Sequence, residues 1–276
     1  MRRLLFPACA VLAAVPGYVL GAPERAEFTT GQWRTCVYAG WSDADLSQVA
    51  DGLSTRIKGY RTEWLRDYGG VASGRARRYS GGITAGWEMG RRFSTNSGWG
   101  LRLEFLAPGD VTGGFSARGD GNEEVAESET ITAALVPVML GIWTTGGKPT
   151  GISVRGFLFA GPAFGSMTDR ISREYYSPND DEYESWASVV SASGLGYAAE
   201  CGGELGYGMP DGLALFAGAA WRTARVGSMR YAASADFDGD GEPDANKGER
   251  IGNSRGDSLR FDFSGFQWTF GIRMAL

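Results

Sequence analysis

The chain has 276 residues, among them 43 glycines, 9 tryptophans and 11 tyrosines but no histidine, and its formal net charge is −5. Glycine at this level argues against a helical bundle and for many tight turns and strand crossings. An acidic chain without a basic cluster is a poor candidate for nucleic-acid binding, and no apolar run of about 18 residues follows residue 22, so no transmembrane helix is predicted.

The N-terminus has the pattern of a secretory signal peptide. A basic start, Met1–Arg3, precedes an apolar run, Leu4–Leu20, and a cleavage site follows Ala22. A membrane anchor is the alternative, but two prolines interrupt the run, and an anchor needs about 20 uninterrupted apolar residues. The sequence therefore predicts a signal peptide over residues 1–22 and a single β domain over residues 23–276.

Eight stretches after the signal peptide alternate apolar residues with polar or small ones, the period of a β-strand. In the first stretch Trp33 and Trp41 fall on one face, and Arg34 and Cys36 fall on the other. The fourth stretch is nearly all apolar, so its phase is ambiguous. Cys201 falls on the opposite kind of face from Cys36, and no disulfide is expected. The predicted strands are about 32–42, 78–90, 98–108, 129–143, 151–167, 189–208, 213–231 and 258–276.

The connections between these strands are long and short in turn. The short turns are 91–97, 144–150 and 209–212, and the long connections are 43–77, 109–128, 168–188 and 232–257. Bacterial outer-membrane barrels have this asymmetry, whereas a soluble sandwich, the alternative, has no reason to place long loops on one side. The fold class predicted is all-β: an eight-stranded antiparallel up-and-down transmembrane β-barrel with long extracellular loops and short periplasmic turns.

The first long connection also contains a helical pattern. Apolar residues recur there at helical spacing and predict a short amphipathic helix. Packing over the barrel mouth is the favoured interpretation, and lying on the membrane surface or binding a partner are the alternatives. The residues of the pattern are Leu46, Val49, Leu53, Ile57, Tyr60 and Trp64.

Two local features give the chain a family resemblance. One is the strand Gly194–Tyr207 with the tight turn after it, and the other is the end of the chain, Thr269–Leu276. The chain after residue 22 resembles the small eight-stranded outer-membrane barrels, the OmpA/OmpX-type and OmpW-like group. Its end resembles the signal read by the barrel-assembly machinery, although Leu276 stands where the family usually has an aromatic residue. The residues of this assembly signal are Thr269, Gly271, Met274 and Leu276.

The resemblance implies a location and a set of partners. The location is the bacterial outer membrane, reached across the inner membrane by means of the signal peptide. The partners are outer-membrane lipids, lipopolysaccharide and the barrel-assembly machinery, with no nucleic acid, and the expected oligomeric state is a monomer. Tryptophans near strand ends or on outer faces would form interfacial girdles. These are Trp33, Trp41, Trp99, Trp143, Trp221 and Trp268.

The inward phase of the predicted strands collects charges of both signs. An eight-stranded barrel is just wide enough for side chains to fill it, and buried charge is tolerated only when it is paired. Arginine suits such pairing because its guanidinium can bind a carboxylate through two hydrogen bonds. The sequence predicts a salt-bridged, mostly closed lumen, with a narrow water path as the alternative. The predicted lumen residues are Arg34, Glu88, Arg102, Glu104, Arg155, Glu200, Glu204, Arg222, Asp262 and Arg273.

The last long connection contains a candidate calcium loop. Asp236, Asp238, Asp240 and Asp244 occupy loop positions 1, 3, 5 and 9, which fits a loop whose hard oxygen ligands wrap one calcium ion. Position 12 is Lys247 instead of the usual glutamate. A solvated acidic turn is the alternative, and no other cofactor is expected.

The absence of histidine bears on activity. The known enzymatic small barrels use histidine for proton transfer, so no enzyme is predicted. The leading hypothesis is a non-enzymatic outer-membrane barrel whose acidic surface loops serve envelope integrity, surface interaction or divalent-cation binding. The alternative is a narrow, porin-like passive channel for small or apolar solutes, as in OmpW-like proteins.

Overall fold

A computed structural model describes residues 30–276 except 45, 79–80, 179–180, 237–241 and 252–259, so the predicted signal peptide lies outside the described residues. The described elements are β1 (Trp33–Ala44), α2 (Ser47–Asp67), β2 (Val71–Arg78), β3 (Gly82–Arg92), β4 (Ser97–Ala107), β5 (Val111–Arg118), β6 (Glu124–Gly147), β7 (Gly151–Ser177), β8 (Glu182–Gly208), β9 (Leu213–Tyr231), β10 (Phe261–Asp262) and β11 (Gly265–Ala275).

Eight of these strands close into a ring. The order around it is β1, β3, β4, β6, β7, β8, β9 and β11, and β11 pairs back with β1. Every neighbouring pair is antiparallel, and three connections at one end are short, 93–96, 148–150 and 209–212. The structure confirms the predicted eight-stranded up-and-down barrel.

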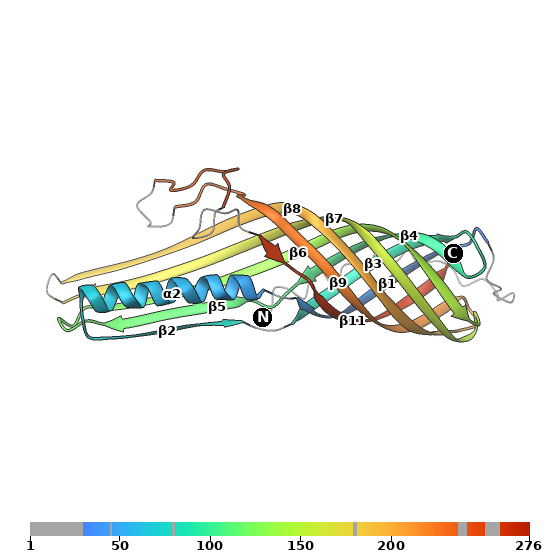
Figure 1. The fold of residues 1–276 in the computed structure, drawn as a ribbon, viewed down its shortest axis with the longest axis horizontal. Coiled ribbons are helices and arrows are strands. Elements are labelled where there is room, and N and C mark those ends of the chain that lie inside the picture. The colour runs from blue at the N-terminus through green and yellow to red at the C-terminus, as the bar shows by residue number, and fades with distance from the viewer. Residues whose placement is uncertain (1–29, 45, 79–80, 179–180, 237–241, 252–259) are drawn as a thin grey trace.

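Three barrel strands continue well beyond the ring at the opposite end (Figure 1). Strand β5 pairs with the extended part of β6, and β2 pairs with β5. Together with the extensions of β7 and β8 they form a five-stranded sheet. We call this five-stranded sheet the platform. Its strand segments are β2, β5, 124–131, 168–177 and 182–191.

The platform corrects two predicted loops. The connections predicted at 109–128 and 168–188 are mostly strand: β5 and β6 cover 111–118 and 124–128, and β7 and β8 cover 168–177 and 182–188. Pro108, which has no backbone N–H to donate, lies between β4 and β5 and marks the step from barrel to platform.

Helix α2 packs its apolar stripe against the inner face of the platform. Leu53 and Ile57 are buried there, and a Cβ atom added to Gly113 would lie 2.7 Å from Leu53. One added to Gly74 would lie 2.7 Å from Ile57. These two glycines therefore let the helix approach β2 and β5 closely. The predicted amphipathic helix is present, and it covers the platform above the barrel mouth (Figure 1). In the described ranges, no helix is both long and apolar enough to cross a membrane.

The outer side of the ring is an exposed apolar belt. A monomeric soluble protein rarely shows apolar patches of more than a few hundred Å², so this belt must be covered by lipid. Trp41, Trp99, Trp221 and Trp268 are exposed on it, as predicted for girdles, but Trp143 is buried in the lumen. The exposed apolar residues of the belt include Leu103, Leu140, Ile142, Val154, Leu158, Phe164, Leu195, Leu205, Leu215, Phe270 and Ile272.

Candidate functional site

The inner side of the barrel wall contains a network of ion pairs centred on Glu88. This carboxylate on β3 accepts hydrogen bonds from three guanidinium groups: Arg34 at 3.0 Å, Arg102 at 2.8 Å and Arg155 at 2.5 Å. The arginines belong to β1, β4 and β7, so one carboxylate connects four of the eight barrel strands. All four side chains are buried, where charge is tolerated only with such partners.

Two more glutamates extend the network toward the platform. Glu200 on β8 accepts hydrogen bonds from Arg102 at 2.5 Å and from Arg222 on β9 at 3.3 Å. Glu104 on β4 accepts one from Arg222 at 2.5 Å and one from the hydroxyl of Thr84 at 2.5 Å. Arg222 thus lies between two carboxylates from opposite parts of the wall.

A fourth glutamate extends the network toward the short turns. Glu204 on β8 accepts two hydrogen bonds from one nitrogen of Arg155, at 3.0 and 3.1 Å, and pairs with Arg273 on β11. The network therefore joins nine of the ten predicted lumen residues in one continuous set. They are Arg34, Glu88, Arg102, Glu104, Arg155, Glu200, Glu204, Arg222 and Arg273.

The tenth predicted lumen residue, Asp262, lies elsewhere, and that part of the prediction is wrong. Asp262 pairs with Arg225 at 3.2 Å on the outer side of the wall, and its other oxygen accepts the N–H of Ser264 at 2.9 Å. The chain leaves the strand at Phe263 and Ser264 and re-enters it at Gly265. The break changes neither register nor phase: Phe261 and Phe263 face inward like Gly265 and Gln267, so Asp262 faces outward.

The lumen contains further polar residues that the sequence prediction did not name, among them Arg92, Gln267 and Thr84. Arg92 is buried at the turn end of β3, and its phase follows from Glu88, but the predicted strand stopped at Gly90. Gln267 accepts a hydrogen bond from Arg222. Thr84 donates to Glu104, as described above. The period of two would have found all three, because each shares its face with a predicted lumen residue.

Aromatic and apolar side chains fill the lumen around and above the charges. The Arg34 guanidinium lies 3.2 Å from the ring centroid of Trp143, and that of Arg102 lies 4.2 Å from the ring centroid of Phe159. Such cation–π contacts stabilise a desolvated guanidinium. Toward the platform the lumen is apolar. Its fully buried side chains include Leu106, Leu135, Met139, Phe159, Phe261 and Phe263.

A small recess marks the end of the lumen near the short turns. Its volume is about 70 Å³, and its lining includes Arg34, Arg92 and Arg273. A space of this size holds only a few water molecules. This basic recess therefore reaches from the short-turn end only as far as the ion-pair network.

The platform holds a second group of buried charges, above the apolar belt. Glu129 on β6 pairs with Arg56 of α2, and Asp169 on β7 lies 4.0 Å from the same guanidinium. Burial, together with the charge of Asp169, raises the pKa of Glu129 to about 8. Burial also raises the pKa of Asp169. The two carboxyls outweigh the half-exposed Arg56, so the pair retains a proton near neutral pH.

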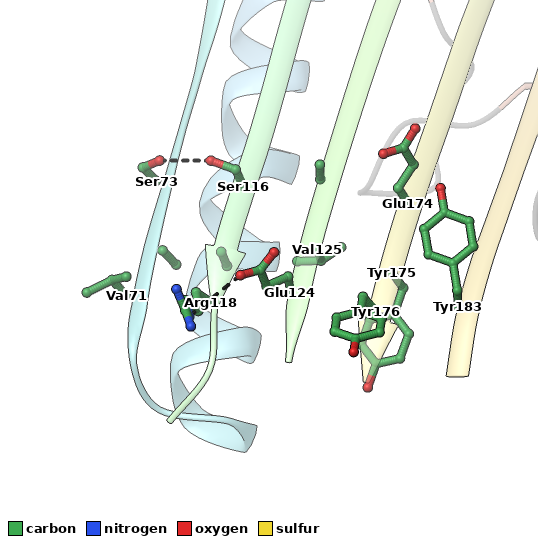
Figure 2. Close-up of a pocket in the computed structure, with 13 residues that line it drawn as sticks. Val71, Ser73, Ser116, Arg118, Glu124, Val125, Glu174, Tyr175, Tyr176 and Tyr183 are labelled. Carbon is green, nitrogen blue, oxygen red and sulfur yellow. Dashed lines mark hydrogen bonds and ion pairs between the residues drawn. The ribbon is translucent and has the colours of Figure 1, made fainter. Parts of the chain in front are cut away.

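Polar side chains lie on the outer face of the platform near its tip (Figure 2). A recess of about 470 Å³ lies near its tip, bordered by Tyr176 and Tyr183. Ser73 and Ser116 hydrogen-bond to each other across β2 and β5 at 3.2 Å, and Arg118 lies 3.6 Å from Glu124. These polar side chains explain why the strands could not be recognised by apolar alternation.

The candidate calcium segment is described only at its two ends. Ala235 and Ala245 pair through two backbone hydrogen bonds, and the carbonyl of Asp236 accepts the Ser188 hydroxyl at 2.6 Å. Asp244 lies next to this bridge, whereas Asp238 and Asp240 lie outside the described residues. In the part of the chain that the structure describes, no group of three or more His, Cys, Asp or Glu side chains is arranged to hold a metal ion.

The predicted assembly signal forms the end of β11. Thr269 is buried on the lumen side, and a Cβ atom added to Gly271 would lie 2.6 Å from the ring of Phe216. Glycine at 271 is thus required by packing in the folded barrel. Met274 pairs with Leu213 and Thr35 in the ladder, and the N–H of Leu276 donates to the Trp33 carbonyl at 2.9 Å.

The closed ring, the apolar belt and the paired lumen charges define a membrane-spanning β-barrel of the outer-membrane type. No family model matches the chain, and no curated protein is similar to it in sequence.

Several solved structures align with most of the chain at low identity. The outer membrane protein OprG from Pseudomonas aeruginosa is 11% identical, with a TM-score of 0.41, and the alignment covers 94% of this chain and 99% of OprG. Ail of Yersinia pestis is 10% identical, with a TM-score of 0.31 and coverage of 90% and 100%. The outer membrane protease OmpT from Escherichia coli is 9% identical, with a TM-score of 0.32 and coverage of 92% and 100%. At these scores the likeness says nothing about function, and the fold is established by the strand pairing itself.

Proposed function

We propose that this protein is a non-enzymatic barrel of the bacterial outer membrane. Its lumen is sealed, and its platform serves surface interaction and envelope integrity. The observation that supports the seal is the continuous ion-pair network around Glu88, with an apolar layer beside it. A hydrated pore would leave guanidinium groups in contact with water, whereas the network pairs each of its five guanidinium groups with at least one carboxylate.

The orientation follows from the barrel's two ends. In outer-membrane barrels the short turns face the periplasm and the longer elements face outward. The platform would therefore project from the cell, with its charged outer face exposed to the medium. Export by the signal peptide and insertion by the barrel-assembly machinery, through Thr269, Gly271, Met274 and Leu276, belong to the same proposal. A monomer in contact with outer-membrane lipids and lipopolysaccharide is the expected state.

Reconstitution in planar lipid bilayers tests the sealed lumen. We expect no discrete conductance steps from the purified, detergent-folded protein at moderate voltage. Reproducible single-channel steps would instead support the alternative, a narrow passive channel. Glu88→Ala gives a positive comparison, because removing the central carboxylate should loosen the network and allow intermittent conductance.

A further inference from the structure

A recess on the outer side of the wall lies where β8, β9 and β10 meet. Its volume is about 540 Å³. Leu195 and Tyr197 of β8 line one side, Arg225 of β9 lies in the middle, and Arg260 and Asp262 line the other side. The recess thus combines apolar, aromatic and cationic side chains in one place.

The recess results from two irregularities in the wall. The ladder between β8 and β9 shifts register between Ser193 and Leu195, and Ser228 on β9 adopts a left-handed φ of 52°. Such a bulge bends the strand and interrupts its pairing. Beside it β10 is only two residues long, and residues 252–259 before it lie outside the described part of the chain. A Cβ atom added to Gly227 would meet nothing within 4 Å, which shows open space at the floor.

The position of the recess relative to the membrane follows from the aromatic side chains nearby. Trp221 and Phe266 are paired in the ladder, and both are exposed at the end of the belt nearest the platform. Arg225 follows Trp221 by four residues on the same side of β9, about 13 Å further along the strand. Since aromatic girdles mark the membrane interface, Arg225 lies at the level of lipid headgroups. Leu195, 65% exposed, pairs with Gly227 and so lies two residues further from the belt than Tyr197, the ladder partner of Arg225.

The charge of the recess favours an anion. The Arg225 side chain is 62% exposed although it pairs with Asp262 at 3.2 Å, and Arg260 is exposed as well. Among the described residues that line the recess, two guanidinium groups therefore face one carboxylate. Gln48, in the first turn of α2, also lines the recess, and that turn has neither an acidic side chain nor a side-chain cap. The positive end of the helix dipole adds to the attraction for a negative group.

We propose that this recess binds a phosphorylated glycolipid of the outer leaflet. Arg225 and Arg260 would hold a phosphate, as guanidinium groups do through paired hydrogen bonds. The acyl chains would lie against Trp221 and Phe266 on the membrane side of the recess, and Tyr197 would contact the adjoining sugar with its ring and hydroxyl. The exposed apolar belt that begins at Trp221 and Phe266, next to the recess, favours an amphiphile over free phosphate. This inference rests on the outer-membrane placement proposed above and adds a site to it.

The test measures the effect of added lipids on the unfolding temperature of the detergent-folded protein, followed by heat-modifiable gel migration. The probes are lipopolysaccharide, the same lipopolysaccharide after enzymatic dephosphorylation, phosphatidylglycerol and inorganic phosphate. We expect lipopolysaccharide alone to raise the unfolding temperature at low concentration. The double variant Arg225→Gln with Arg260→Gln should need about tenfold more of it or show no response, because a hydrogen bond to a charged group contributes at least that factor.

Two further variants sharpen the test. Arg170→Gln removes one guanidinium group from the exposed outer side of the platform, outside the recess, as each substitution of the double variant removes one inside it, and should respond as the unmodified protein does. Asp262→Asn should respond at lower lipopolysaccharide concentration, because it removes the carboxylate that competes for Arg225 while its side-chain oxygen can still accept the Ser264 N–H. A purely structural role of this ion pair would give the opposite result.

The outcomes separate this site from the function proposed above. An unchanged response in the double variant, or an equal response to phosphatidylglycerol or inorganic phosphate, would overturn the glycolipid site. Neither result bears on the sealed lumen, which the bilayer recordings test independently. A double variant that folds and remains non-conducting but no longer responds to lipopolysaccharide would support both proposals.

Discussion

Glu88 is the residue on which the lumen depends most, because three guanidinium groups converge on it. Replacing it with alanine leaves those cations buried without their common partner. We expect Glu88→Ala to lower the free energy of unfolding by about 3–5 kcal/mol, the cost of breaking a buried ion pair from one side. Urea titration of the detergent-folded barrel, followed by tryptophan fluorescence, measures this loss in the free energy of unfolding.

A surface ion pair provides the matched control for Glu88. Glu124 lies 3.6 Å from Arg118 at the exposed tip of the platform. Glu124→Ala should change the free energy of unfolding by less than about 1 kcal/mol, because solvent screens exposed pairs. Equal losses from the two variants would show that the lumen network does not stabilise the barrel.

Glu129 makes the docking of α2 dependent on pH. Its pKa rises from 4.5 to about 8 in the folded protein. A carboxyl whose pKa is raised by folding contributes stability that is fully present below its unfolded pKa and is lost as the pH rises through its folded pKa. Between about pH 5 and about pH 8, protection of α2 from proteolysis should therefore fall, and it should change little above that range. Glu129→Gln should keep that protection constant, and a wild-type profile that rises with pH would contradict the assignment.

At the scale of elements, α2 is held by a few apolar contacts and should be separable from the barrel. Leu53→Ala leaves a cavity against Gly113 and should weaken docking of the helix by about 2–5 kcal/mol. Hydrogen exchange should then increase in β2 and β5 but not in β1 or β11. Leu65→Ala, at an exposed position of the same helix, is the control. Increased exchange throughout the barrel would show that platform and barrel unfold as one unit.

The acidic segment from Asp236 to Asp244 gives a prediction about a metal. If its carboxylates wrap calcium, the ion should raise the protection of this segment from proteolysis. The double substitution Asp238→Asn and Asp240→Asn should abolish that effect of calcium. An unchanged calcium response in this variant would contradict calcium binding by this segment.

The platform shows why apolar alternation does not predict strands outside the membrane. In the ring, lipid requires an apolar outer face, so Trp268 and Phe270 alternate visibly with Gln267 and Thr269. In β5 and the first residues of β6 the outer face meets water, and Ser116 or Glu124 occupies it. Without an apolar outer face those strands resemble loops.

At the scale of the whole molecule, the ring and most of the lumen were predictable from one rule. A strict period of two assigned Arg34, Glu88 and Arg273 to the interior without knowledge of their partners. The prediction was wrong at Asp262, although the phase of β11 continues unbroken into β10 and places that residue outward. It was also wrong at Trp143, which lies in a stretch apolar on both faces. The pairing partners themselves could not be predicted, because register between distant strands is set by the closed barrel.

Two native cysteines report on the two faces of the barrel wall. Cys36 is buried on the lumen side and pairs with Glu88 in the β1–β3 ladder. Cys201 is exposed on the outer side of β8, where Leu158 and Trp221 are its ladder neighbours. A sealed lumen and a lipid-covered outer face therefore predict different reactivity of the two cysteines toward thiol reagents. Peptide mass spectrometry identifies which cysteine has been modified.

Labelling of these two thiols in lipid vesicles tests the central claim most directly. A small charged, water-soluble reagent should label neither cysteine, a lipid-soluble maleimide should label Cys201 only, and both should react after denaturation. Modification of Cys36 by the charged reagent would reveal a water path through the lumen. Modification of Cys201 by the same reagent would show that the belt does not lie in lipid.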